Sequence, residues 1–202
     1  MSKRPIIVLT GGPCGGKTTL IRELLGHPSW SNRVVALPEA ISVAGQVGIS
    51  PRDRLFQRLM VELQAAMEKA LDLALGTEDS RAILCHRGTL DPLAYWLHRG
   101  WPEKEFFTFT RTCPDGHYQR YTAVIHLVTA AKGASEHYQR WPHAHRPESP
   151  AEAIRLDQLL QRVWSKHSKY FQLDNEEGNW MAKSEKAQTI LKHLISLSHS
   201  QS

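Results

Sequence analysis

Residues Gly11–Thr18, near the start of the chain, have the types and spacing of a phosphate-binding loop. They match the pattern G-x-x-x-x-G-K-[ST] without a gap. The glycines let backbone N–H groups turn inward around an anion, Lys17 places a cation at the terminal phosphates, and Thr18 offers a hydroxyl ligand to Mg²⁺. The loop therefore predicts binding of a nucleoside triphosphate with Mg²⁺. The residues expected to hold it are Gly11, Gly12, Pro13, Cys14, Gly15, Gly16, Lys17, Thr18 and Thr19.

Two further side chains could take part in chemistry on a triphosphate. Glu39 follows the apolar run 34–37 by two residues, behind a proline. A carboxylate there could accept the proton of a substrate hydroxyl, or ligate Mg²⁺ through water. Arg87 comes soon after the apolar run 82–85, and its planar cation suits phosphate oxygens. We therefore expect Lys17, Glu39 and Arg87 to be the catalytic residues.

A long irregular segment, residues 131–150, is expected to form a lid. It carries Arg140 and Arg146 together with several histidines. Loops of this length in compact domains are usually functional or disordered. A lid that brings the two arginines over the phosphates would exclude water and stabilise charge in the transition state. Arg140 and Arg146 are therefore expected to contact the nucleotide.

The elements that must position these residues alternate between strand-like and helix-like segments. Such alternation predicts a parallel sheet covered by helices on both faces, an α/β fold. Ligands of such sheets bind beyond the carboxyl ends of the strands, so the candidate residues should converge on one edge. The expected strands are residues 6–9, 34–37, 82–85, 124–128 and 171–173.

Local signals also place helix ends. Ser50 and Pro51 are expected to open a long helix as N-cap and first residue, with an apolar stripe through Leu55, Leu59, Leu63, Met67 and Leu71 packed in the core. Ser149 to Glu152 has the pattern of a capping box at the start of another helix. Residues 196–202 form a polar tail that we expect to be disordered.

Composition indicates one globular domain over the 202 residues, with 41% apolar and 22% charged residues. The net charge is +5, but Lys and Arg are scattered, which favours a solvated basic surface over nucleic-acid binding. The three cysteines are widely spaced and argue against a disulfide framework. Without an evident signal peptide or an apolar run long enough to span a membrane, we expect a cytoplasmic protein with no membrane partner.

The sequence resembles an AAA-type P-loop family, which groups the ribosylnicotinamide kinase domain of NadR with the nucleotide-binding domain of a photoreceptor translocation-defect protein. The resemblance rests on Leu9–Thr19, Pro38–Ala40, His86–Tyr95 and Arg146–Glu148, and continues to Lys183. It implies a P-loop NTPase fold, a three-layer α/β/α sandwich with five parallel strands and an arginine-bearing lid, like that of nucleoside kinases. By the same resemblance, Glu39 matches the acid that serves as base in such enzymes.

One position departs from the family pattern. Where the family usually has Asp before Arg-Gly, this chain has His86. An acid there would help hold Mg²⁺ through water, and a neutral imidazole is a poor substitute. Either Glu39 or another carboxylate such as Asp91 fills this role, or turnover is slow.

Three functions remain open from the sequence. The first is a kinase that transfers the γ-phosphoryl group of Mg-ATP to a hydroxyl of an unidentified small molecule, with nucleosides among the candidates. The second is an ATP- or GTP-binding switch that hydrolyses slowly and acts through a protein partner. The third is a nucleic-acid-binding ATPase, and the positive net charge is the only feature of the sequence that favours it. The sequence does not name the acceptor or the oligomeric state.

Overall fold

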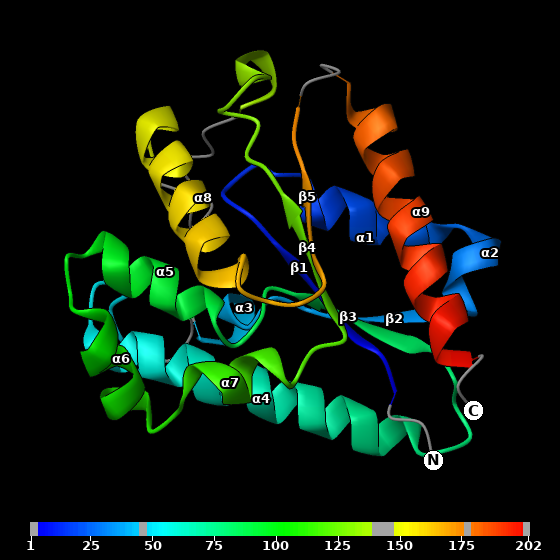
Figure 1. The fold of residues 1–202 in the computed structure, drawn as a ribbon, viewed down its shortest axis with the longest axis horizontal. Helices are drawn as coiled ribbons and strands as arrows, with labels where there is room; N and C mark the ends of the chain where they lie inside the picture. The colour runs from blue at the N-terminus through cyan, green and yellow to red at the C-terminus, as the bar shows by residue number, and fades with distance from the viewer. Residues whose placement is uncertain (1–3, 45–47, 139–147, 176–178, 200–202) are drawn as a thin grey trace.

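A computed structural model describes residues 4–44, 48–138, 148–175 and 179–199. Its centre is a sheet of five parallel strands in the order β2-β3-β1-β4-β5 (Figure 1). The strands are β1 (Ile6–Thr10), β2 (Val34–Leu37), β3 (Ala82–His86), β4 (Ala123–Leu127) and β5 (Tyr170–Leu173). All five lie within two residues of the positions predicted from the apolar runs.

Helices cover both faces of this sheet, which makes the three-layer α/β/α arrangement expected. One face is covered by α4, α5, α6, α7 and α8, and the other by α1, α2 and α9 (Figure 1). The helices are α1 (Lys17–Gly26), α2 (Pro28–Ser31), α3 (Ile41–Ala44), α4 (Arg54–Leu75), α5 (Asp91–His98), α6 (Glu103–Thr110), α7 (Pro114–Tyr118), α8 (Pro150–Trp164) and α9 (Trp180–His199).

The core divides into two clusters because alternate strand residues face opposite layers. In β1, Ile6 and Val8 pack with Trp164 of α8 on one face. Ile7 and Leu9 pack against α1 and α9 on the other face. Each fully buried large apolar side chain stabilises the fold by about 1.5–3 kcal/mol. Burial on both faces therefore fixes the middle strands and, with them, the loops at their carboxyl ends.

The prediction for the start of the long helix was wrong. Helix α4 begins at Arg54 with Asp53 as its N-cap, and Ser50 instead accepts a backbone hydrogen bond from Asp53 in the preceding turn. The buried residues of α4 are Phe56, Gln57, Val61, Gln64 and Glu68. The expected stripe is only partly buried, and Leu55 is 56% exposed. Polar residues of α4 can be buried because they have hydrogen-bond partners in the interior. For example, the Tyr121 hydroxyl donates to Glu68 at 2.8 Å.

Two other helix predictions had different outcomes. The capping box at Ser149 is confirmed, with the Ser149 and Glu152 side chains each bonded to the other's backbone N–H. The tail was expected to be disordered from residue 196, but α9 continues to His199. Leu191, Leu194 and Ile195 are buried in that helix, and this packing carries the helix beyond the last predicted apolar position.

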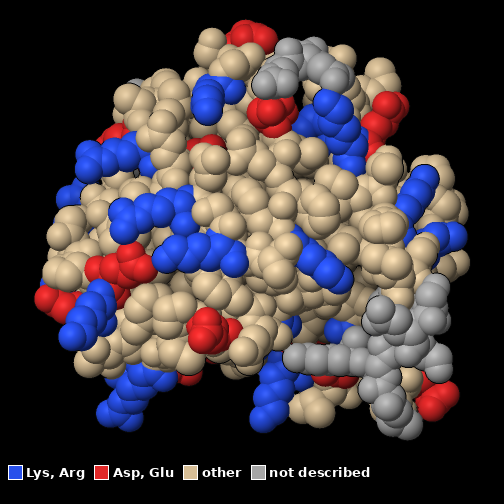
Figure 2. Space-filling model, viewed as in Figure 1, with Lys and Arg blue, Asp and Glu red and all other residues tan. Residues whose placement is uncertain are grey.

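The surface in Figure 2 carries Lys and Arg side chains spread over several elements, with Asp and Glu between them. No continuous basic patch covers this face of the molecule. Within the part of the chain that the structure describes, no helix is both long enough and apolar enough to cross a membrane.

Candidate functional site

The loop between β1 and α1 has the conformation that its glycines allow. Gly11 and Gly16 have φ values of 121° and 95°, in the region that disfavours side chains. A Cβ at Gly11 would also clash with the carbonyl of Leu127, just where β4 ends. The loop is therefore held against β4, and Gly16 serves as N-cap of α1, whose N-terminus faces the loop.

Lys17 is buried within this loop. Its ammonium group donates to the carbonyl oxygens of Gly11 and Gly12 at 2.7 and 2.9 Å. The cation thus lies at the centre of the loop, where it would meet phosphate oxygens. Thr18 and Thr19 follow in the first turn of α1 and are exposed. The loop residues predicted to bind nucleotide therefore lie together around the Lys17 ammonium group, and their role in binding a nucleotide stays a prediction.

Thr18 contacts the residue at which the chain departs from its family. The Thr18 hydroxyl and Nε2 of His86 are 3.0 Å apart and form a hydrogen bond. His86 ends β3, next to β1. Burial lowers the pKa of His86 to about 3, so the ring is neutral at physiological pH. Its other nitrogen, Nδ1, is buried and has no hydrogen-bond partner.

Glu39 and Arg87 form an ion pair at the same edge of the sheet. Arg87 Nε donates to Glu39 Oε1 at 2.7 Å, and Glu39 Oε2 lies 3.7 Å from His86 Nδ1. Burial by itself would raise the pKa of Glu39, but the guanidinium of Arg87 outweighs it and the pKa falls to about 2. Arg87 has a φ of 80°, a strained backbone for a non-glycine residue. The structure thus brings Glu39 and Arg87 into contact, and the charge of Lys17 also lowers the Glu39 pKa.

Asp91 does not serve as a free carboxylate in this cleft. It is 2% exposed and accepts hydrogen bonds from Thr10, Trp164 and Arg87. These donors satisfy the buried charge and fasten the Arg87 turn to β1 and α8. The suggestion that Asp91 replaces the missing acid for Mg²⁺ therefore finds no support in its contacts.

A second buried carboxylate, Asp157 of α8, was missed by sequence reasoning. Its Oδ1 accepts from Gly12 N at 2.7 Å, from Thr129 N at 3.1 Å, and lies 3.0 Å from His126 Nε2. Burial raises the pKa of Asp157, yet the bonds to His126, Gly12 and Thr129 lower it overall. Asp157 stands four residues after buried Ala153 and three before buried Leu160. That helical spacing was the available signal for a buried carboxylate.

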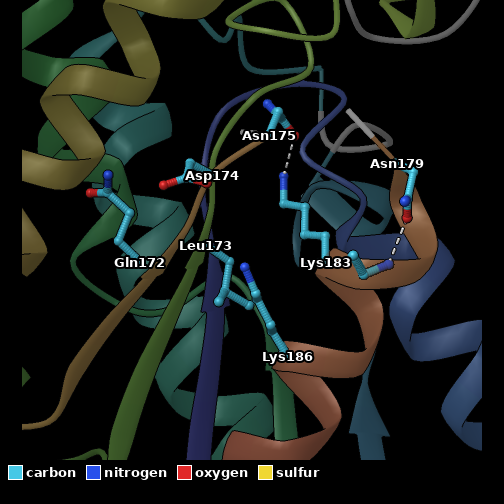
Figure 3. A pocket seen from close by; sticks show the side chains of 8 residues that line it. Gln172, Leu173, Asp174, Asn175, Asn179, Lys183 and Lys186 are labelled. Atoms are coloured by element: carbon cyan, nitrogen blue, oxygen red, sulfur yellow. Dashed lines mark hydrogen bonds between the residues drawn. The ribbon is translucent and has the colours of Figure 1, made fainter. Parts of the chain in front are cut away.

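A pocket of about 100 Å³ lies beside the loop, between the end of β5 and the start of α9 (Figure 3). Its polar lining includes Asp174, Asn175 and Lys183, and Lys183 donates to Asn175 Oδ1 and to the carbonyl of Val128. Burial lowers the pKa of Lys183 to about 8. Trp180, the first residue of α9, packs against Gly16, so a Cβ at Gly16 would clash with its ring. The pocket and the phosphate cradle are therefore neighbours.

The predicted lid can be placed only in part. Residues 131–138 include a short 3₁₀ helix, Ser135–His137, and the Tyr138 hydroxyl donates to the carbonyl of Glu148 at 2.9 Å. Arg140 and Arg146 lie outside the described residues, and so do His143 and His145. Their expected role above the phosphates stays a prediction.

Mg²⁺ is the metal that such a site implies, and the residues fit a divalent ion only in part. Thr18 supplies an exposed hydroxyl beside the cradle. Within the described ranges, no three His, Cys, Asp or Glu side chains gather as a metal cluster. An ion here would take most of its ligands from phosphates and water, as Mg²⁺ usually does at nucleotide sites.

The fold and the loop together define a P-loop nucleotide-binding protein. The model of an AAA domain family matches residues 6–183, and the chain belongs to this family. Among solved structures, the chain is similar to a deoxyadenosine kinase from M. mycoides determined with the products dCMP and a flexible dCDP bound, with a TM-score of 0.60. The sequence identity is 14%, and the match covers 93% of this chain and 99% of that one, which establishes a shared fold. A search of curated proteins found no significant match.

Proposed function

We propose that this protein is a kinase that transfers the γ-phosphoryl group of ATP to a hydroxyl of a small, nucleoside-like molecule. The observation that carries the proposal is the Glu39–Arg87 pair, which lies at the edge of the sheet that also holds Lys17 and Thr18. A phosphoryl-transfer site needs positioned cations around the phosphates and a group that orients the acceptor hydroxyl. Lys17, Arg87 and Glu39 are the candidates for these roles. The likeness to a deoxyadenosine kinase supports a nucleoside-like acceptor.

Each residue has a defined role in this proposal. Lys17 and the backbone of the loop bind the β- and γ-phosphates, and Thr18 is the protein ligand of Mg²⁺. When bound, Mg²⁺ neutralises phosphate charge. Glu39 accepts a hydrogen bond from the acceptor hydroxyl and directs it at the γ-phosphorus. With a pKa of about 2 it is a weak base, so its main contribution is orientation, which suits a loose transition state that needs little proton removal.

The base of the nucleotide is assigned to the pocket between β5 and α9. Trp180 and Lys183 connect this pocket to Gly16 and to the end of β4, so a nucleotide with its phosphates in the cradle can extend into it (Figure 3). The amide and carboxylate groups of the lining offer hydrogen bonds to a base edge.

A second candidate is the slowly hydrolysing switch, and His86 is the observation that favours it. A neutral imidazole replaces the carboxylate that would assist Mg²⁺, which would weaken catalysis more than binding. In this case the chain would bind ATP or GTP and signal to a partner without transferring the phosphoryl group.

Release of ADP from Mg-ATP, measured with and without a panel of nucleosides, distinguishes the kinase from the switch. Lys17→Ala serves as the blank because its cradle lacks the central cation. A kinase releases ADP at a rate that depends on one or more of the nucleosides. Slow release that is indifferent to every nucleoside would overturn the kinase proposal and favour the switch.

A further inference from the structure

The Thr18–His86 pair has the spacing of two neighbouring ligands of one metal ion. Thr18 Oγ1 and His86 Nε2 are 3.0 Å apart. Two ligand atoms at adjacent corners of an octahedron, each about 2.1 Å from the metal, are separated by about 3.0 Å. A cation could therefore replace the hydrogen bond without a change in the separation of the two side chains.

The far side of the imidazole also suits a metal ligand. His86 Nδ1 is buried, has no hydrogen-bond partner and faces Glu39 Oε2 at 3.7 Å. Metal-bound histidines usually donate their other ring N–H to a carboxylate, which fixes the ring and the tautomer. Glu39 is itself held by Arg87. A shift of less than 1 Å along this line would complete a carboxylate–histidine–metal arrangement, since N–H···O bonds are about 2.9 Å long.

Imidazole nitrogen and hydroxyl oxygen do not select the same ions. Mg²⁺ prefers an all-oxygen octahedron, whereas imidazole favours divalent ions of the first transition row, whose affinities rise from Mn²⁺ to Cu²⁺. The neighbouring carboxylates do not offset this preference: Asp91 is engaged by Thr10, Trp164 and Arg87. Glu39 is paired with Arg87.

We propose that His86 and Thr18 are direct ligands of the divalent ion that accompanies the nucleotide, and that the site prefers a first-row transition-metal ion over Mg²⁺. This inference rests on the proposed function only in that the nucleotide phosphates supply further ligands. His86 thus sets the metal specificity of the cleft.

The test uses the full chain with ATP and Mn²⁺, followed by pulsed electron paramagnetic resonance. Mn²⁺ is a stringent probe because it binds imidazole least well in the series. A ¹⁴N coupling to Mn²⁺ is expected in the wild type and in His193→Ala, a control at an exposed histidine of α9 outside the predicted lid. The coupling should vanish in His86→Asp. In a competition between Co²⁺ and Mg²⁺ for the ATP complex, His86→Asp should lower the preference for Co²⁺ by about tenfold.

Binding of ATP, followed by fluorescence of a labelled analogue, distinguishes failure of this inference from failure of the proposed function. If ATP binds but Mn²⁺ shows no ¹⁴N coupling, or His86→Asp leaves the Co²⁺ preference unchanged, His86 only fixes the Thr18 hydroxyl and the inference is overturned while the proposed function stands. If the wild-type chain binds no nucleotide, both are overturned.

Discussion

At the scale of single residues, the site is organised by the charge of Arg87. This guanidinium is the largest of the causes that lower the pKa of Glu39, and it lies 3.3 Å from Asp91 Oδ2. The centre of the Tyr95 ring lies 5.5 Å from the guanidinium carbon. Its strained backbone conformation is maintained by these contacts. Glu39 is therefore held ionised and in a fixed orientation, as its proposed hydrogen bond with the acceptor hydroxyl requires.

Replacing Glu39 by Gln should test that role. We expect phosphoryl transfer to fall by about 10²-fold, because a neutral amide orients the acceptor hydroxyl less well than the carboxylate, while ATP-induced thermal stabilisation is retained. The rate of ADP release with a productive nucleoside measures the first quantity. Glu62→Gln, at an exposed residue of α4 outside the predicted lid, is the matched control and should leave the rate unchanged. An undiminished rate in Glu39→Gln would show that Glu39 is not part of the reaction.

Much of the site could be predicted at this scale because its signals are local. The loop motif, Glu39 behind its proline and Arg87 after an apolar run each lie within a few residues of a strand end. The contact between Asp157 and His126 was out of reach because the two residues are 31 positions apart in sequence and meet only in the folded chain. The pairing of His86 with Thr18, 68 residues away, was equally invisible.

At the scale of elements, α8 fastens the phosphate-binding loop to the end of β4. Asp157 of α8 accepts a hydrogen bond from Gly12 N in the loop and another from Thr129 N beyond β4. Helix α8 begins at Pro150, the last residue of the predicted lid, so we expect a displacement of the lid to be transmitted through α8 to the loop.

The substitution Asp157→Ala tests this connection. It leaves Gly12 N and Thr129 N buried without their acceptor, and each such group costs about 1–3 kcal/mol. We expect the free energy of unfolding to fall by about 3 kcal/mol and the affinity for ATP to weaken. Chemical denaturation and nucleotide titration measure the two effects. Asp115→Ala, at an exposed position of α7, is the control; an equal loss of stability there would contradict the account.

Element positions were predictable where burial follows a simple rule. The three middle strands were found because parallel strands buried on both faces are continuous apolar runs. The edge strands β2 and β5 are only partly buried, and their short apolar runs were enough to place them. Helices α6 and α7 were not recognised. Helix α6 is short, and its buried residues are Phe106 and Thr110, too few for a periodic pattern. The start of α4 was misplaced because Ser50 and Asp53 are both residue types that favour the N-cap position. The helix begins after the second, whose side chain makes no capping hydrogen bond.

At the scale of the whole molecule, several histidines are buried in neutral form. Burial lowers the pKa of His86 to about 3 and that of His117 to about 4, from an ordinary value of 6.5. The unfolded chain therefore binds protons at a higher pH than the folded chain does. Stability is complete above about pH 6.5 and is lost as the pH falls toward 4.

This linkage predicts a measurable slope of the free energy of unfolding against pH. Between pH 6.5 and 4, each of the two histidines should lower the free energy of unfolding by on the order of 1 kcal/mol per pH unit. Denaturation at a series of pH values should show a shallower slope in the double variant His86→Asn and His117→Gln. His137→Gln, on an exposed side chain, should keep the wild-type slope. An identical slope in all three proteins would contradict the assignment of buried neutral histidines.

The central claim is that a nucleoside triphosphate binds in the loop around Lys17, and thermal unfolding with ATP tests it most directly. At 100 times the dissociation constant, ATP adds about 2.7 kcal/mol, which corresponds to a rise in Tm of roughly 5–10 °C for a domain of this size. The account predicts this rise in the wild-type chain and its loss in Lys17→Ala. A Tm that ATP does not change in the wild type, or raises equally in Lys17→Ala, would contradict it.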